Sequence, residues 1–324
     1  MPPALPFLAF VAAVSLAGAE PPRVLPETST LLEVAARPRD PFRDPLPKDP
    51  ALAQQIQLGY RIFTETGRYA PKYTGNGLTC GNCHLNAGQR EGAMPVVGVA
   101  AIFPENNPRS GRLFSLQDRV VSCFLRSING ANAPGATEEN IDENGKAELF
   151  VSPRSPEVLA VSAYVTWLSE GIPLGQKPAW RGVKQLAPEA RIPIAKLSPD
   201  QGRELYADYC QGCHGEDGQG VDLEVAKPGP LWGPRSWNDG ASLARPYMLA
   251  GMIRHAMPYL GPGSLTDEES QHIAAYITSQ PRPHFRAQAR DYVDGKIPED
   301  AVYDTRRFPV NPLRAGGGGA TPAR

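Results

Sequence analysis

The amino-acid sequence predicts a mainly α-helical protein with two related domains. Two observations support this fold class. The chain has 324 residues, which is enough for two domains of ordinary size. The same succession of local patterns also occurs twice, once in residues 49–171 and again in residues 198–284, which indicates a diverged internal duplication.

Composition restricts the function classes. The formal net charge is −1, so the chain has no global attraction for nucleic acid or for an anionic membrane. We therefore expect no nucleic-acid partner. The 32 Gly and 35 Pro residues predict many turns, and a hydrophobic content of 41% suggests that part of the core volume comes from another source.

Residues 1–19 have the pattern of an export signal. Their apolar run ends in Ala17-Gly18-Ala19, the small-residue pattern of a cleavage site. We expect cleavage near Ala19 and a periplasmic location, with an uncleaved membrane anchor as the alternative. No later segment is long and apolar enough to cross a bilayer, so we expect no membrane span in the mature chain. Residues 20–48 are Pro-rich and predict a leader arm.

Each copy of the repeat begins with a helix. Asp49-Pro50 and Ser198-Pro199 each place a capping residue before a proline at the first helical position. Gln201 is expected to complete a capping box with Ser198. Both helices then carry a glycine that is followed three and four residues later by an aliphatic and an aromatic residue, in LGYRIF (58–63) and QGRELY (201–206).

The later patterns of the two copies also correspond. Each copy has a Cys-x-x-Cys-His segment, then a Pro-x-x-Gly loop and finally a helix with AYVT or AYIT. These elements are CGNCH (80–84), Pro95–Gly98 and AYVT (163–166) in the first copy, and CQGCH (210–214), Pro230–Gly233 and AYIT (275–278) in the second. Thr266 and Glu269 predict a capping box at the start of the last helix. The first copy has additional residues before its cysteines, including KYTGNGLT (72–79).

The segments outside the two copies have no clear periodicity. Residues 172–197 are assigned to a linker on the surface. Residues 285–324 are polar and end in a Gly-rich stretch, which predicts a mobile C-terminal tail.

A Cys-x-x-Cys-His segment in an exported chain is the attachment signature of a c-type haem. Its two thiols bond to the porphyrin and the histidine supplies the proximal nitrogen to iron. Zinc binding, a redox-active pair and structural disulfides are the alternatives, but they do not explain a histidine directly after both pairs. We expect two class I cytochrome c-like domains with two covalently attached haem c groups, bound by Cys80, Cys83 and His84, and by Cys210, Cys213 and His214.

Each iron needs a second axial ligand. In the second domain Met257 precedes Pro258 in a Gly-rich loop and is the preferred candidate, whereas Met252 is expected to pack in a helix. Met248 and His255 are rivals. A His/Met pair raises the potential of iron, which suits an electron-exit haem. In the first domain, Met94 aligns with Gly229 on the proximal side, where a loop carbonyl can orient the histidine ring.

Cys123 stands 39 residues after His84, close to the spacing of 43 residues between His214 and Met257. Ser115 and Asp118 predict the start of its helix. Three interpretations remain open: a buried hydrophobe, half of a disulfide, or a thiolate ligand of iron. The third explains the missing ligand, because a cationic surround and ferric iron both favour a thiolate. This haem would then have the lower potential and pass electrons to the second haem.

The Cys123 segment is locally basic. Between residues 109 and 126 it has four arginines and a single acid, Asp118. Arg119, Cys123 and Ser127 are spaced by four residues and share one face of the predicted helix. Guanidinium groups in this setting suit a small oxyanion.

Residues 50–284 resemble the diheme thiosulfate dehydrogenases, which interconvert thiosulfate and tetrathionate. The most specific stretch is RSGRLFSLQDRVVSCFLRSING (109–130), supported by CGNCHLNAG and CQGCHGEDGQG. The resemblance implies that Cys123 is the distal ligand of the active-site haem, that Arg119 and Ser127 line the substrate site, and that Arg109 and Arg112 lie nearby. Some members have Lys before the second methionine ligand, where this chain has Ala256.

These observations lead to a periplasmic oxidoreductase that joins two thiosulfate ions into tetrathionate. The expected acceptor is a soluble protein, such as a small cytochrome c or a high-potential iron–sulfur protein. A diheme electron carrier without catalysis is one alternative. A sulfur-oxidation cytochrome that acts on a carrier-protein cysteine is the other.

Overall fold

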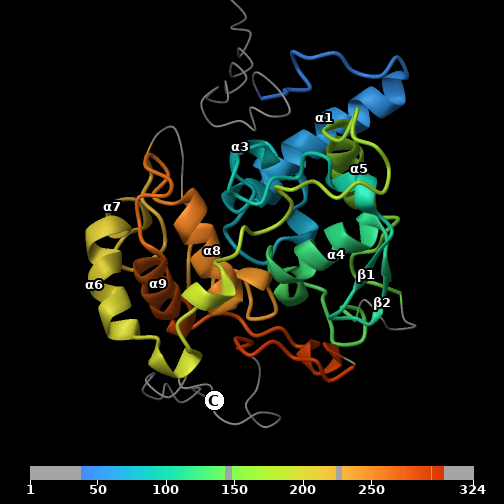
Figure 1. Cartoon of the computed structure of the whole chain (residues 1–324). Coiled ribbons are helices and arrows are strands. Elements are labelled where there is room, and N and C mark those ends of the chain that lie inside the picture. The colour runs from blue at the N-terminus through green and yellow to red at the C-terminus, as the bar shows by residue number, and fades with distance from the viewer. Residues whose placement is uncertain (1–37, 143–147, 224–227, 293, 303–324) are drawn as a thin grey trace, which may run out of the picture.

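The computed structural model describes residues 38–142, 148–223, 228–292 and 294–302. It is mainly helical, as expected, and its two helical domains lie side by side (Figure 1). The expected signal at residues 1–19 lies outside the described residues. The helices are α1 (Pro50–Thr64), α2 (Thr66–Tyr69), α3 (Leu85–Gly88), α4 (Leu116–Arg126), α5 (Pro156–Trp167), α6 (Pro199–Tyr209), α7 (Gln211–His214), α8 (Pro246–Ala256) and α9 (Asp267–Ser279), and the strands are β1 (Glu105–Asn107) and β2 (Arg112–Phe114).

The first and last helices of each domain cross at a glycine. A Cβ atom on Gly59 of α1 would lie 2.0 Å from the Ala160 carbonyl oxygen of α5. A Cβ atom on Gly202 of α6 would lie 1.9 Å from the His272 carbonyl oxygen of α9. Only glycine allows two backbones to approach this closely. The glycine that repeats in the sequence is therefore the crossing point of the helix pair in both domains.

The helix starts predicted from the sequence follow the capping rules, with one difference. The Asp49 side chain accepts from the backbone N–H of Ala51 at the start of α1, and Thr266 and Glu269 form the expected capping box of α9. Ser198 accepts from the Gln201 N–H, but the reciprocal bond is missing. The N–H of Ser198 instead donates to Nδ1 of His272 at 3.0 Å, so a tertiary contact with α9 takes the place of half the box.

The antiparallel hairpin β1–β2 leads into α4, the helix that carries Cys123. Ser115 caps α4, and its side chain and that of Asp118 form a capping box, as the sequence predicts. The extra segment of the first domain supports the other end of this helix. Asn76 donates from Nδ2 to the Ser127 carbonyl at 2.9 Å and to the Ser236 carbonyl at 3.3 Å. The segment at residues 72–79 therefore joins the end of α4 to the second domain.

The segment after residue 284 was expected to begin a mobile tail, but its described part packs on the first domain. The N–H of Tyr292 donates to the Arg109 carbonyl at 2.6 Å, and Phe285 is buried. Arg290 pairs with Asp142 at 2.6 Å. These contacts cross from the second domain to the first, which the polar composition of the segment gave no reason to expect.

The arm and the linker also contact the domains. The guanidinium carbon of Arg39 lies 3.8 Å from the centre of the Trp167 ring. The indole N–H of Trp167 donates to the Pro45 carbonyl at 3.1 Å. In the linker, Trp180 donates to the Val97 carbonyl at 3.0 Å, so this segment packs on the first domain as expected of a surface linker. Within the described residues, the helices lack the combination of length and apolar composition that is needed to cross a membrane.

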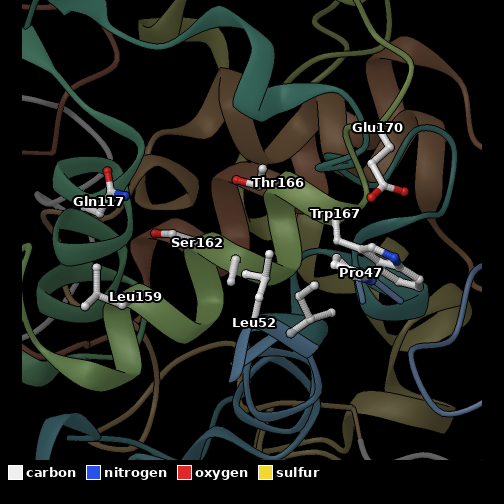
Figure 2. A pocket seen from close by; sticks show the side chains of 10 residues that line it. Pro47, Leu52, Gln117, Leu159, Ser162, Thr166, Trp167 and Glu170 are labelled. Atoms are coloured by element: carbon white, nitrogen blue, oxygen red, sulfur yellow. The ribbon is translucent and has the colours of Figure 1, made fainter. Parts of the chain in front are cut away.

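A hollow of about 300 Å³ lies between α1 and α5 (Figure 2). Leu52, Ser162 and Trp167 are among the residues that line it. None of the expected haem ligands or arginines lines this hollow. The chemistry predicted from the sequence is therefore located elsewhere, on α4 and the two cysteine-containing segments.

Candidate active site and haem-binding segments

The first Cys-x-x-Cys-His segment has an oriented histidine. Nδ1 of His84 lies 2.6 Å from the carbonyl oxygen of Met94. Because a carbonyl only accepts, Nδ1 carries the proton and Nε2 keeps the lone pair that a metal needs. The expected contact between a loop carbonyl and the histidine ring is therefore confirmed for Met94.

The second segment repeats this arrangement more loosely. The carbonyl of Gly229 takes the place of the Met94 carbonyl near His214, although Nδ1 of His214 makes no hydrogen bond of ordinary geometry. Burial lowers the pKa of both His84 and His214, and the nearby carbonyls oppose that effect in part. Both rings are therefore neutral near pH 7, the form in which imidazole binds a metal.

The thiols also fit covalent haem attachment. Cys80, Cys83, Cys210 and Cys213 are all free. Burial raises the pKa of Cys80 and of Cys83 to about 12, and the charge of Cys123 acts in the same direction on both. Cys123 therefore lies close to the first pair of cysteines. With the oriented histidine and four free thiols, the residues present match what two haem c groups require.

Helix α4 presents a continuous open stripe formed by Arg119, Cys123 and Ser127. Arg119 is exposed and the other two are half-buried, while the adjacent residues Val120 and Phe124 are buried. The charge of Arg119 contributes to the lowered pKa of His84, after the larger effect of burial. The stripe therefore faces the first Cys-x-x-Cys-His segment, and the structure brings these predicted site residues together.

The arginines near Cys123 differ in their partners. Arg112 pairs with Asp118 at 3.1 Å, and its guanidinium carbon lies 4.5 Å from the centre of the Phe114 ring. Arg109 donates to the Gly240 carbonyl. The guanidinium group of Arg119 makes no hydrogen bond or ion pair in the part of the chain that the structure describes. It is thus the cation of this group that is available to an anionic ligand.

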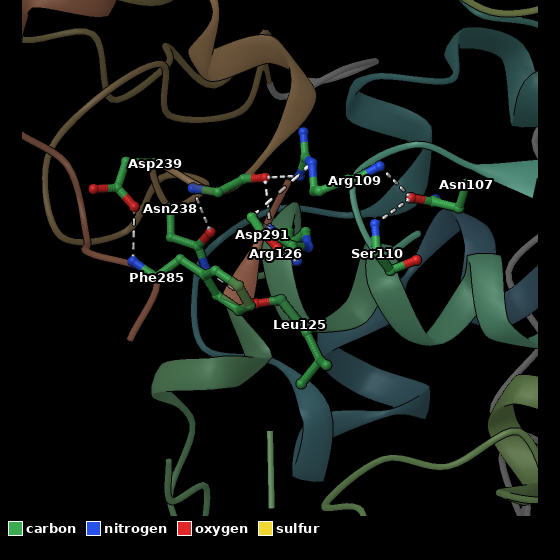
Figure 3. A network of polar contacts seen from close by, with 10 residues as sticks. Asn107, Arg109, Ser110, Leu125, Arg126, Asn238, Asp239, Phe285 and Asp291 are labelled. Atoms are coloured by element: carbon green, nitrogen blue, oxygen red, sulfur yellow. Dashed lines mark hydrogen bonds and ion pairs between the residues drawn. The ribbon is translucent and has the colours of Figure 1, made fainter. Parts of the chain in front are cut away.

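A buried polar network fixes the C-terminal end of α4 (Figure 3). Arg126 is 3% exposed and forms two hydrogen bonds of 2.7 Å with the carboxylate of Asp291. Its guanidinium carbon lies 4.0 Å from the centre of the Phe285 ring. Asn238 donates to the carbonyl of Leu125 at 2.9 Å. Sequence reasoning missed Asp291 and Asn238, because both reach α4 from segments more than 100 residues away in the sequence.

The methionines of the second domain occupy different environments. Met257 is the C-cap residue of α8 and is half-buried. Met252 is buried in the core, as expected of a packing residue. Met248 accepts from Nε2 of Gln185 at 3.2 Å, and the backbone of His255 packs against Gly92 of the first domain. Met257 therefore differs from its rivals: it is not buried in the core like Met252, and unlike Met248 its sulfur accepts no hydrogen bond from another described residue.

The two cysteine-containing segments are connected across the domain interface. A Cβ atom on Gly229 would lie 2.1 Å from Cδ2 of Leu78 and 3.1 Å from Cγ of Asn82. Arg90 donates to the Tyr259 carbonyl at 2.5 Å and stacks on the Tyr259 ring, with its guanidinium carbon 4.0 Å from the ring centre. The loop after each histidine thus contacts the other domain beside that domain's candidate haem ligands.

Two helical domains, each with a neutral histidine directly after a pair of free thiols, define a diheme c-type cytochrome. Residues 198–277 match the family described as cytochrome c oxidase, cbb3-type, subunit III. The chain is 36% identical over 252 residues to a thiosulfate dehydrogenase of Allochromatium vinosum, covering 75% of this chain and 84% of the relative. It is 34% identical over 273 residues to a thiosulfate dehydrogenase of Stutzerimonas stutzeri, covering 82% and 78%.

A solved structure is also similar. The thiosulfate dehydrogenase TsdBA from Marichromatium purpuratum matches with a TM-score of 0.63 and 32% identity. The match covers 74% of this chain and 49% of the other, so the chain spans about half the length of TsdBA. This chain belongs to the thiosulfate dehydrogenase family, and its cofactors are haem c groups.

Proposed function

We propose that this protein oxidises two thiosulfate ions to one tetrathionate ion at the stripe formed by Arg119, Cys123 and Ser127. The reaction forms one S–S bond and releases two electrons, which two one-electron acceptors take up. The observation that carries the proposal is the position of the stripe: a cation without a partner in the described structure and a free thiol lie together beside the His84 segment.

Arg119 is assigned the electrostatic role. Two unit charges of like sign 4 Å apart repel by about 4 kcal/mol at an effective dielectric constant of 20, and thiosulfate carries two negative charges. A guanidinium group offers planar paired donors that suit an oxyanion. Arg109 and Arg112 lie in the same segment, but Asp291 and Asp118 neutralise part of their charge. Arg119 therefore aligns and stabilises the two substrate ions, and Ser127 offers a hydroxyl on the same face.

Cys123 is proposed as the distal ligand of the first haem, opposite His84. Its effect on the pKa of Cys80 and of Cys83 supports this position, because it shows that the three sulfur atoms lie near one another. A disulfide is disfavoured because Cys123 is free. A purely apolar role is disfavoured because Cys123 is half-buried on the open face of α4.

Met257 is proposed as the distal ligand of the second haem, opposite His214. The haem groups supply the one-electron chemistry of the reaction. We further propose that the protein is exported to the periplasm and reduces a soluble acceptor, such as a small cytochrome c or a high-potential iron–sulfur protein. The support for export is the small-residue cleavage pattern before Glu20.

The test is a turnover assay of Cys123→Gly with thiosulfate and ferricyanide. We expect the variant to lose turnover while its absorption spectrum still shows two attached haems. Ser122→Ala, on the buried side of the same helix, is the matched control and should keep its activity. Full activity of Cys123→Gly would remove Cys123 from the reaction.

The same assay separates the alternative functions. A simple electron carrier would show no turnover with thiosulfate in the unmodified protein. A cytochrome that acts on a carrier-protein cysteine would require that carrier in the assay. Turnover with thiosulfate and ferricyanide alone supports the dehydrogenase.

A further inference from the structure

The second Cys-x-x-Cys-His segment has an exposed apolar surface around it. Cys213 is exposed, and the N–H of Val221 donates to its carbonyl at 2.9 Å. Tyr209, Val221 and Leu223 are large hydrophobic residues that are 48%, 40% and 38% exposed. Tyr209 ends α6 and Cys213 belongs to α7, and both helices lie on the side of the second domain that is farther from α4 (Figure 1). Apolar groups exposed together beside a redox centre favour contact with a protein.

The first Cys-x-x-Cys-His segment does not have such a surface. Gly229 of the second domain packs on Leu78 and Asn82, and Gly77 packs against the Arg235 guanidinium. In contrast, a Cβ atom added to Gly212 in the second segment would have nothing within 4 Å. The first Cys-x-x-Cys-His segment therefore faces the other domain, and the second faces solvent.

The surface near Cys213 is also acidic. Residues 203–223 include five carboxylates and one cation, Arg203, and all six side chains belong to exposed residues. The carboxylates are Glu204, Asp208, Glu216, Asp217 and Asp222. This charge is opposite in sign to that of residues 109–126 beside Cys123, where four arginines outnumber Asp118 and Asp291, the two acids that pair with them. The protein thus places positive charge where an anion is expected and negative charge at the other Cys-x-x-Cys-His segment.

We propose that this acceptor face, defined by Tyr209, Cys213, Val221, Leu223 and the five carboxylates, docks a small redox protein that has a basic patch around its own redox centre. The proposal rests on the proposed function, because it names the partner that removes the electrons. Each encounter transfers one electron, which oxidises this protein and reduces the partner, so two encounters follow each tetrathionate formed.

The charge of the acceptor face favours a basic redox protein over a second copy of this chain. A second copy of this chain would bring two acidic rims together, which like-charge repulsion opposes. A basic partner is attracted, and electrostatic steering accelerates such association by 10-fold or more at low salt. The apolar centre then gives a close contact of the small, short-lived kind that electron-transfer complexes use.

The experiment uses the holoprotein, reduced with dithionite, and oxidised mitochondrial-type cytochrome c as the cationic probe. The measurement is the second-order rate constant of cytochrome c reduction as a function of ionic strength. The variant Asp208→Lys/Glu216→Lys reverses charge on the acceptor face, whereas Glu138→Lys/Glu148→Lys makes the same change at exposed residues of the first domain. We expect the first variant to lose at least 10-fold at low salt and the control to lose less than 2-fold.

Three readouts complete the test. The unmodified protein should react more slowly as salt is added and should prefer the cationic probe to an acidic cytochrome. Equal losses in the two variants, or no loss in the first, would overturn the docking proposal. Thiosulfate-driven reduction of the protein's own haems, without acceptor, should be equal in all three proteins. Failure of that step in the unmodified protein would contradict the proposed function and leave the dithionite test of docking intact.

Discussion

The carboxylate of Asp291 accepts two hydrogen bonds of 2.7 Å from Arg126, and this pair joins the C-terminal segment to the helix that carries Cys123. Both side chains are buried. A buried ion pair of this kind is sensitive to the loss of either partner, because the remaining charge then lacks both water and a counter-ion. The pair therefore links the stability of the protein to the position of α4.

Asp291→Asn is expected to lower the free energy of unfolding by about 3–5 kcal/mol, because Arg126 stays buried without its counter-ion. Urea unfolding of the holoprotein measures this change. Asp294→Asn, at an exposed carboxylate three residues later, should change stability by less than about 0.5 kcal/mol. Equal stability of the two variants would contradict the prediction that Arg126 needs the Asp291 carboxylate as its counter-ion.

Gly59→Ala should destabilise the first domain, because the new methyl group meets the Ala160 carbonyl of α5 at 2.0 Å. Overpacking typically costs about 1–3 kcal/mol, and here the neighbour is backbone and cannot rotate away. Gly67→Ala, where a Cβ atom would meet nothing within 4 Å, is the control and should be neutral or slightly stabilising. Thermal unfolding followed by circular dichroism would detect the difference, and a neutral Gly59→Ala would contradict the close crossing.

Arg119→Gln should lower kcat/KM for thiosulfate by about 100-fold or more, because it removes the cation that is available to the substrate. Stability should change little, since Arg119 is exposed and its guanidinium group makes no hydrogen bond or ion pair to any other described residue. Arg119→Lys keeps the charge but loses the planar pair of donors. Its kcat/KM should therefore lie between that of the unmodified protein and that of Arg119→Gln. Arg68→Gln, at an exposed arginine on α2, is the charge-matched control. An activity loss as large in the control as in Arg119→Gln would rule out a local role.

We expect the protein to lose folding stability in acid when Asp118 becomes protonated. Burial raises its pKa, but the hydrogen bonds from Arg112 and Ser115 outweigh burial and hold the pKa below its usual value. The unfolded state therefore binds the proton more readily, and the stability from Asp118 is present above about pH 4 and is lost as pH falls through the lowered pKa.

Asp118→Asn should accordingly be less stable than the unmodified protein at pH 7, and the difference should shrink as pH falls from about 5 to 3. Urea unfolding at a series of pH values measures this trend. A difference that stays constant with pH would show that Asp118 acts through its shape rather than its charge.

Interactions between residues close in sequence were predictable, and interactions between distant segments were not. The helix starts at Asp49, Ser115 and Thr266 were predictable because a cap involves neighbours within one turn. Ser198 was only half predicted, since its N–H turns to His272 of α9, which lies 74 residues away in sequence. Met94 was placed correctly because the duplication aligned it with Gly229, and the structure adds the 2.6 Å contact of its carbonyl with His84.

The sequence by itself determined the two cysteine-containing segments, the duplicated helical frame and the shared face of Arg119, Cys123 and Ser127, because covalent chemistry and helical periodicity are local properties. Only the tertiary structure decided which arginines are available to a ligand. In the sequence Arg112 and Arg126 cannot be told apart from Arg119. In the structure Arg112 pairs with Asp118, and Arg126 pairs with Asp291. Ion pairs between distant segments depend on how the chain packs, and the Asp291 carboxylate reaches α4 only because the C-terminal segment returns to the first domain.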